Sequence, residues 1–428
     1  MLTIERPPIA VVVQQHAEES AMLRLVRSVL VRAPHVRLRH LRRLDDRIAA
    51  HLDGLSVAGR YGTALCTAAL ERAGAGEVFA AAIRAIDEHD AKALHRLIAL
   101  SAALPDARRG LVSAFGWVSA AQLQGIVRDL LSSREPGPRE LALAACRLHR
   151  VDPGPALATA WRDENPALRA QALRAAGELG RTDSMAAALA AVADGDAAVA
   201  WRAISCAVLL GDRADAMSAL EALAHGDGVF SEQALHLLLL ATELQRGRSI
   251  VRKLAQGAKP DAALKRRVIR ACGLLGDAQF VPWLMEMMAD EVQARIAGEA
   301  FTFITGADLA DLDLERKPPE NPPGGPSGDP DDDNVALDDD ESLPWPDLER
   351  VQRWWEANAL RLPVDSRSFM GAAVTPGHVA HVLYEGTQRQ RFAAATHRCL
   401  LNPGTALFPV CEPSWRQQRR LAALTPSA

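Results

Sequence analysis

Hydrophobic residues recur with helical spacing in four consecutive segments between residues 165 and 290. In an overlay of these segments, Leu173, Ile204, Leu238 and Ile269 share one apolar position, at spacings of 31, 34 and 31 residues. Each segment predicts a pair of helices, because apolar residues three and four positions apart mark one face of a helix. A helix pair of this length cannot bury its apolar face alone, so we expect the pairs to stack into a solenoid.

Glycines mark the turn between the two helices in three of the four predicted repeats. The first helix is expected to stop at Gly180, Gly211 and Gly276, because glycine readily takes the left-handed conformation that ends a helix. The third repeat has residues 243–246 at this place instead. Small residues share a second position and would let neighbouring first helices approach closely: Ala176, Ala207, Ala241 and Cys272. The second helices are predicted over residues 185–192, 216–223, 249–254 and 280–288.

Looser helical patterns precede the regular repeats, and we interpret them as degenerate repeats. They cover residues 60–72, 75–88, 91–104, 108–116, 119–131 and 137–149. Before them, residues 24–43 contain seven arginines and no acid, which we interpret as the solvated face of a capping helix.

The composition changes after residue 316. Residues 317–345 are rich in Pro, Gly and Asp, which predicts a disordered linker. Beyond the linker we expect a small separate module, with helices entered at Pro344, Thr375, Arg389 and Pro413. Residues 368–374 and 406–410 are predicted to be its short strands.

Charge is distributed unevenly in the C-terminal part of the chain. Residues 318–349 contain eleven acidic and no basic residues, whereas residues 350–428 contain ten arginines and four acids, a net charge of +6. The whole chain carries a formal charge of −4. We therefore expect the acidic linker to be attracted to the basic module and to shield its arginines until a partner displaces it.

The overall composition limits the fold class and the cellular location. Hydrophobic residues make up 49% of the chain but aromatic residues only 4%, which favours helix over strand. The six cysteines are scattered without CxxC spacing, so neither zinc binding nor a disulfide framework is predicted. An apolar run of the length that spans a membrane is missing from the sequence, and a cytoplasmic location is expected.

Several motifs resemble a known repeat class. NPALRAQALRAAGELG (residues 165–180) and LLGD (residues 274–277) resemble HEAT-like repeats of the short subtype first recognised in bilin lyases. With RLDDRIAAHLDGLSVAG, LPWPD, WW, RQRFAAA and SWRQQRR, the chain resembles a proteobacterial family of HEAT-repeat proteins. Genes of that family often lie beside type VI secretion genes, so the resemblance implies an accessory, adaptor or chaperone-like role in effector delivery. It supplies no catalytic residue.

The sequence therefore predicts an all-α fold. Its core is a right-handed α-solenoid of HEAT-like helical repeats, joined to a small, mainly helical C-terminal module with at most two short strands. The predicted segments are an N-terminal helical cap (residues 1–45), degenerate HEAT-like helix pairs (46–164), regular repeats (165–316), the acidic linker (317–345) and the basic module (346–428).

A search for reactive or metal-binding motifs gives no enzyme class. DPDDDNVALDDDE (residues 329–341) alternates Asp like a calcium loop, but Asn334 replaces the turn glycine and Asp340 the terminal Glu. The sequence contains no nucleophile elbow, P-loop or dinucleotide fingerprint. We therefore predict a non-enzymatic protein without a cofactor or metal, while an enzyme whose site forms only in three dimensions is the third alternative.

The leading prediction is a scaffold or adaptor that binds a protein partner on the concave face of the solenoid. The residues expected to contact the partner from the repeats are Gln171, Arg174, Arg202, Gln233, Arg267 and Arg270. Trp354 and Trp355 are expected either to pack in the core or to anchor a contact. The alternative is nucleic-acid binding by interleaved arginines and aromatics, namely Arg389, Arg391, Phe392, Arg398, Trp415, Arg416, Arg419 and Arg420. Arg389 and Arg391 would otherwise pair with acids inside the module.

Overall fold

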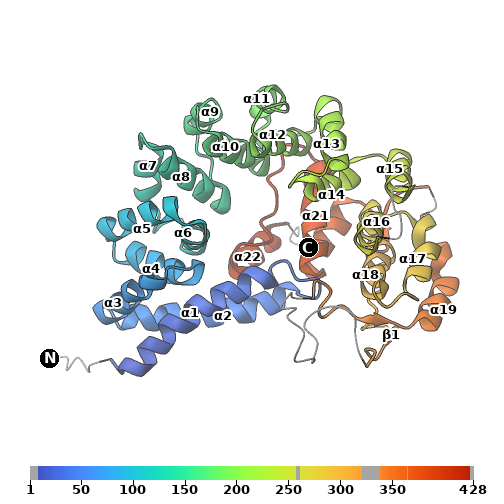
Figure 1. Cartoon of the computed structure of the whole chain (residues 1–428), viewed down its shortest axis with the longest axis horizontal. Helices are drawn as coiled ribbons and strands as arrows, with labels where there is room; N and C mark the ends of the chain where they lie inside the picture. The colour runs from blue at the N-terminus through green and yellow to red at the C-terminus, as the bar shows by residue number, and fades with distance from the viewer. Residues whose placement is uncertain (1–7, 257–260, 321–337, 364, 425–428) are drawn as a thin grey trace. The chain divides into compact units, whose positions relative to one another are not determined.

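A computed structural model describes residues 8–256, 261–320, 338–363 and 365–424 (Figure 1). The chain divides into two compact units. Unit 1 comprises residues 1–212 and 403–428, and unit 2 comprises residues 213–402. The predicted all-α, solenoid-like fold is confirmed, since strands within the described ranges are limited to two short antiparallel pairs.

Unit 1 is built from thirteen described α-helices. In chain order they are α1 (Ala10–Leu30), α2 (Leu38–Val57), α3 (Arg60–Ala69), α4 (Ala75–Asp87), α5 (Ala91–Ala103), α6 (Pro105–Trp117), α7 (Ile126–Leu131), α8 (Pro136–His149), α9 (Pro155–Ala160), α10 (Pro166–Leu179), α11 (Met185–Ala190), α12 (Ala197–Leu209) and α22 (Ser414–Leu424). Short 3₁₀ turns follow α3 (Leu70–Arg72) and precede α11 (Thr182–Ser184).

Unit 2 combines helices with the two strand pairs. Its elements are α13 (Asp215–His225), α14 (Ser231–Ala241), α15 (Leu244–Gln256), α16 (Ala262–Leu275), α17 (Val281–Met287), α18 (Ala294–Thr305), β1 (Glu315–Arg316), β2 (Trp345–Pro346), α19 (Leu348–Asn358), β3 (Ser368–Phe369), β4 (Ala372–Ala373), α20 (Pro376–Glu385) and α21 (Gln388–Leu401). Strand β1 pairs with β2, and β3 forms a hairpin with β4. Single 3₁₀ turns precede α17 (Ala278–Phe280) and follow α19 (Ala359–Arg361).

Within each unit, the first helices of successive helix pairs pack side by side, and we call them the inner helices. They are α8, α10 and α12 in unit 1 and α14, α16 and α18 in unit 2. In unit 1, α9 and α11 lie on one side of this row and α22 lies on the other (Figure 1). Ala176, Ala207 and Cys272 are fully buried, as expected for small residues at the contact between helices.

The turn glycines behave as the repeat pattern predicts. Gly180 and Gly276 end α10 and α16 with φ of +74° and +71°. A Cβ atom on Gly180 would lie 2.2 Å from the carbonyl oxygen of Gly404, and one on Gly276 would lie 2.1 Å from that of Ser368. A later segment of the chain therefore crosses each of these turns, and only glycine satisfies both the backbone conformation and the close approach.

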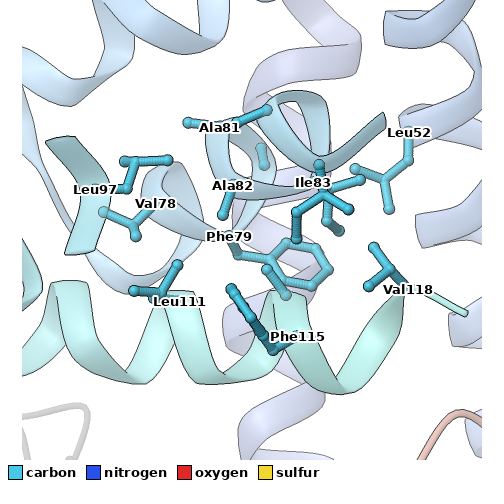
Figure 2. Packing of buried hydrophobic residues seen from close by; sticks show 14 of the residues in the cluster. Leu52, Val78, Phe79, Ala81, Ala82, Ile83, Leu97, Leu111, Phe115 and Val118 are labelled. Atoms are coloured by element: carbon cyan, nitrogen blue, oxygen red, sulfur yellow. The ribbon is translucent and has the colours of Figure 1, made fainter. Parts of the chain in front are cut away.

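A hydrophobic core fills the N-terminal half of unit 1 (Figure 2). Helix α4 lies at its centre and is apolar on nearly all sides, as is typical of a buried helix. Phe79 of α4 packs among Leu52, Leu111 and Phe115 from α2 and α6. The segment that the sequence predicts as degenerate repeats thus carries a continuous core.

Three local predictions differ from the structure. The predicted boundary after residue 45 falls inside α2. Residues 120–125 form turns, and the helix begins only at Ile126, because Gly125 has φ of +89°. Residues 406–410 form no strand. The Leu407 N–H donates to the Glu178 carbonyl oxygen at the end of α10 (2.9 Å). This segment therefore pairs with a carbonyl group that the helix end leaves open, and not with another strand.

The C-terminal segments also differ from their predicted organisation. Of the predicted disordered linker, residues 321–337 lie outside the described residues, but residues 338–345 have defined positions and contacts. Arg316 pairs with Trp345 in the β1–β2 ladder. Residues 346–428 do not form one separate module, since residues 346–402 belong to unit 2 and residues 403–428 to unit 1. Side chains of α18 contact the first part, and side chains of α1, α2 and α6 contact the second.

Candidate interaction surface on the inner helices

Arginines on the inner helices of unit 1 gather around one carboxylate. Glu178 of α10 accepts from Arg147 Nη1 of α8 (3.0 Å), from Arg174 Nε (2.7 Å) and from Arg150 Nη1 (3.3 Å). Arg147 and Glu178 occupy the same repeat position 31 residues apart, so the stacking of α8 on α10 brings them together. We call Arg147, Arg150, Arg174 and Arg202 the unit 1 arginine cluster.

The electrostatics of this cluster leave positive charge in excess. Burial opposes ionisation of Glu178, but Arg147, Arg174 and Arg150 together hold the pKa of this carboxyl well below its ordinary value. Burial lowers the pKa of Arg147 to about 10, and Glu178 works against that shift. Three guanidiniums therefore share one acidic side chain.

Arg202 is the least satisfied member of the cluster. It is partly buried on α12, and burial, with a further contribution from Arg174, lowers its pKa to about 10. Within the described part of the chain it has no hydrogen-bond or salt-bridge partner. On α10, one turn before Arg174, the buried Nε2 of Gln171 has no hydrogen-bond partner among the described residues either. Gln171, Arg174 and Arg202, all predicted to contact a partner, thus lie on the two adjacent helices α10 and α12.

Two arginines on the inner helices of unit 2 are occupied by the chain's own acidic residues. Asp340 accepts from Arg266 Nη1 and Nη2 of α16, both at 2.6 Å. Asp338 accepts from Arg295 Nη1 of α18 (2.7 Å), and the same nitrogen donates to the Asp340 carbonyl oxygen (3.0 Å). Asp340 is only 2% exposed, because this bidentate contact buries it. The end of the acidic run therefore docks on inner-helix arginines.

The other predicted contact residues of unit 2 differ in their surroundings. Arg270 is partly buried, and burial together with Arg266 and Arg389 lowers its pKa. Arg267 pairs with Glu232 (2.5 Å) and donates to the Ala224 carbonyl oxygen (2.9 Å). Gln233 is exposed on α14.

Arg389 and Arg391 of α21 have intramolecular roles. Arg389 Nη1 donates to Glu299 Oε2 (2.7 Å), a buried carboxyl whose pKa is raised by burial. Arg391 is fully buried and donates to the Leu383 carbonyl oxygen (2.7 Å) and to Gln388 Oε1 (2.5 Å). Both guanidiniums are therefore occupied by groups of the chain itself.

The tryptophans serve as packing residues. Trp354 and Trp355 both meet the ring of buried Phe301 of α18, at centroid distances of 5.6 and 6.4 Å. Trp415 packs edge-on against Trp117, at 4.9 Å. These rings attach α19 to α18 in unit 2 and α22 to α6 in unit 1.

Arginines of α22 hold this helix against unit 1. Arg416 Nη2 donates to the carbonyl oxygens of Gly116, Trp117 and Val118 at the end of α6, at 2.8, 2.5 and 2.9 Å. Arg420 pairs with Glu412 (2.7 Å). Arg419 is exposed.

The N-terminus of α22 is fixed by a carboxylate that sequence patterns did not single out. Asp45 of α2 is fully buried, accepts from the Ser414 N–H (2.7 Å) and pairs with Arg27 Nε (2.5 Å). Arg27 also donates to the carbonyl oxygens of Cys411 and Glu412, both at 3.0 Å. Arg42 of α2 also donates to Gln418 Oε1 (2.9 Å), so two arginines of the basic stretch at residues 24–43 bind the C-terminal segment, whereas the sequence predicts a solvated face.

Sequence reasoning missed Arg147, Arg150, Glu178 and Asp340. The 31-residue spacing of Arg147 and Glu178 is a signal that the repeat overlay could have revealed. The pairing of Arg266 with Asp340 has no such signal, because these residues are 74 positions apart and belong to no shared repeat.

The part of the chain that the structure describes contains no group of three His, Cys, Asp or Glu side chains placed to hold a metal ion. Residues 329–337 of the calcium-like run lie outside those residues. None of the described helices combines the length and the hydropathy needed to cross a membrane. No protein-family model and no curated protein matches the chain.

Proposed function

We propose that the protein is a non-enzymatic scaffold or adaptor that binds an acidic segment of a protein partner on the inner helices of unit 1. The observation that carries this proposal is the unit 1 arginine cluster, in which three guanidiniums pair with the carboxylate of Glu178 and a fourth, that of Arg202, has no ion-pair partner among the described residues. A partly buried charge is costly unless a group of opposite charge is near. A partner carboxylate placed between Arg174 and Arg202 would supply that charge.

Unit 2 supports the choice of an acidic peptide as the ligand. In the repeat overlay, Arg270 occupies the position of Arg174. Near Arg270, the acidic run of the chain places Asp340 on Arg266 and Asp338 on Arg295. A segment rich in Asp is thus the kind of ligand that inner-helix arginines of this chain already bind.

Nucleic-acid binding by residues 389–420 has weaker support. Its arginines divide between the two units, and Arg389, Arg416 and Arg420 each donate to groups of their own unit. An accessory or chaperone-like role in type VI effector delivery is a narrower proposal, and it rests on the sequence resemblance alone.

The test is a titration with a defined acidic probe. A fluorescein-labelled synthetic peptide with the sequence of residues 329–341 is titrated with the full-length protein and followed by fluorescence anisotropy. The Arg174→Gln, Arg202→Gln double variant is expected to bind at least about tenfold more weakly, because charge-assisted contacts contribute about 1.5–3 kcal/mol each. Arg162→Gln, which changes an exposed arginine beyond α9, is the matched control and should bind as the wild type does.

Two outcomes would contradict the proposal. Equal peptide affinity of the wild type and the double variant would show that the cluster is not the binding site. Tighter binding of a labelled single-stranded DNA, lost on Arg419→Gln, would favour the nucleic-acid alternative.

A further inference from the structure

A cleft of about 380 Å³ lies in unit 2 between α14, α21 and the β3–β4 hairpin. Its volume falls in the range of small-molecule sites, which measure roughly 300–1,000 Å³. Leu240 and Ala241 of α14, Val374 after β4 and Leu400 of α21 give it an apolar wall. This combination of size and wall suits a short hydrocarbon chain.

A cation without an acidic partner also lines the cleft. Arg367 donates to the carbonyl oxygens of Leu274 (3.1 Å) and Thr242 (2.9 Å), where α16 and α14 end. Burial lowers the pKa of Arg367 to about 10, and no acidic side chain of the described residues offsets that shift. The helix ends fix the guanidinium in place, but they carry only partial negative charge.

Two buried polar groups beside Arg367 lack partners. His397 is 3% exposed, packs against Phe369 with a centroid distance of 5.0 Å, and also lines the cleft. Its Nε2 and the Oγ1 of Thr242 have no hydrogen-bond partner among the described residues. Burial, and then Arg367, lower the pKa of His397 to about 3, so the ring is neutral at pH 7. Buried polar groups in proteins are nearly always paired, so these two need an explanation.

We propose that this cleft binds a small aliphatic carboxylate, with the carboxylate at Arg367 and the hydrocarbon chain against Leu240, Val374 and Leu400. The hydroxyl of Ser366 and the exposed Arg213 are further polar groups that line the cleft. A role of Arg367 as a helix cap accounts for its two contacts with carbonyl oxygens. It does not account for the apolar wall or for the unpaired groups of Thr242 and His397.

The test compares two probes of the same shape by isothermal titration calorimetry with the full-length protein. Sodium hexanoate is expected to bind at least about tenfold more tightly than hexanamide, because only the carboxylate forms charge-assisted hydrogen bonds with Arg367. Arg367→Gln is expected to remove this preference.

A second variant separates binding from folding, because Arg367 also caps two helices. Val374→Trp fills the cleft from the hairpin side, keeps Arg367 and should abolish hexanoate binding. Val229→Trp, at a site that is 81% exposed and away from the cleft, should leave it unchanged. Equal affinity for the two probes, no binding of hexanoate by the wild type, or full binding by Val374→Trp would overturn the proposal. The outcome is independent of the acidic-peptide site, which uses other residues.

Discussion

Glu178 determines how much positive charge the unit 1 arginine cluster exposes. Its carboxylate balances the charge of one guanidinium and positions the side chains of Arg147, Arg150 and Arg174. The same ion pairs leave Arg147 only 7% exposed, so its charge depends on this single partner. Removing that partner should therefore cost more stability than removing a surface ion pair.

We predict that Glu178→Gln lowers the free energy of unfolding by about 3–5 kcal/mol, because it leaves a buried charge uncompensated. Urea unfolding followed by circular dichroism at pH 7 measures the loss. Glu164→Gln, at an exposed carboxylate outside the cluster, is the control and should change stability by less than about 0.5 kcal/mol. Equal effects of the two substitutions would show that the cluster contributes little to stability.

The stability that Glu178 contributes should also depend on pH. The pKa of this carboxyl is lower in the folded chain than its ordinary value of 4.5, so the unfolded chain takes up the proton first as pH falls. The stability difference between the wild type and Glu178→Gln should therefore be constant above about pH 5.5 and shrink as pH falls below 4.5. The same urea experiment at a series of pH values checks this, and a difference that grows on acidification would be inconsistent with it.

At the scale of elements, segments near the C-terminal end of the chain form hydrogen bonds with the ends of the inner helices. Residues 404–407 cross the end of α10 in unit 1, and residues 368–371 cross the ends of α16 and α18 in unit 2. They supply N–H donors to carbonyl groups that a helix end leaves unpaired. The repeats are therefore not independent of the C-terminal segments.

We predict that Gly276→Ala destabilises the protein by more than about 1 kcal/mol. The left-handed conformation costs an alanine about 1–2 kcal/mol, and the alanine Cβ would collide with the Ser368 carbonyl oxygen. Gly137→Ala in α8 is the matched control, because a Cβ there meets nothing within 4 Å and alanine favours a helix. Thermal unfolding should show a lower Tm for the first variant and an unchanged or higher Tm for the second.

Two arginines of α22 allow a comparison within one helix. Arg416→Gln should loosen α22, because three carbonyl oxygens at the end of α6 lose a charged donor. Hydrogen exchange of peptides covering residues 414–424 is expected to accelerate by about tenfold or more, consistent with about 1.5–3 kcal/mol for hydrogen bonds to charged groups. Arg419→Gln should leave the exchange unchanged, and similar acceleration in both variants would contradict this account of α22.

At the scale of the whole molecule, sequence periodicity predicted the helical repeats well. The 31-residue spacing and the turn glycines located α10, α12 and α16 closely, because stacking imposes the same pattern on each repeat. The contacts of the C-terminal segments were not predictable in this way. They join Asp45 to Ser414 and Arg266 to Asp340, pairs that depend on the path of the chain in three dimensions.

The candidate site was predicted only in part. Gln171, Arg174 and Arg202 were expected to contact a partner because they follow the inner face of the repeats. Their excess charge depends on Arg147, Arg150 and Glu178, which the apolar periodicity did not single out. Shielding of the module's arginines until a partner displaces the acidic run stays a prediction. Asp340 and Asp338 contact Arg266 of α16 and Arg295 of α18, whereas Arg389 of α21 donates to the Asp339 carbonyl oxygen (3.1 Å).

Photo-cross-linking tests the central claim most directly. A synthetic peptide of residues 329–341 carries benzoyl-phenylalanine in place of Val335, and its cross-links to the full-length protein are mapped by mass spectrometry. We predict cross-links within residues 136–209, where the inner helices of unit 1 lie, and their loss in the Arg174→Gln, Arg202→Gln double variant. Cross-links confined to other parts of the chain, or kept by that variant, would contradict an acidic-partner site on unit 1.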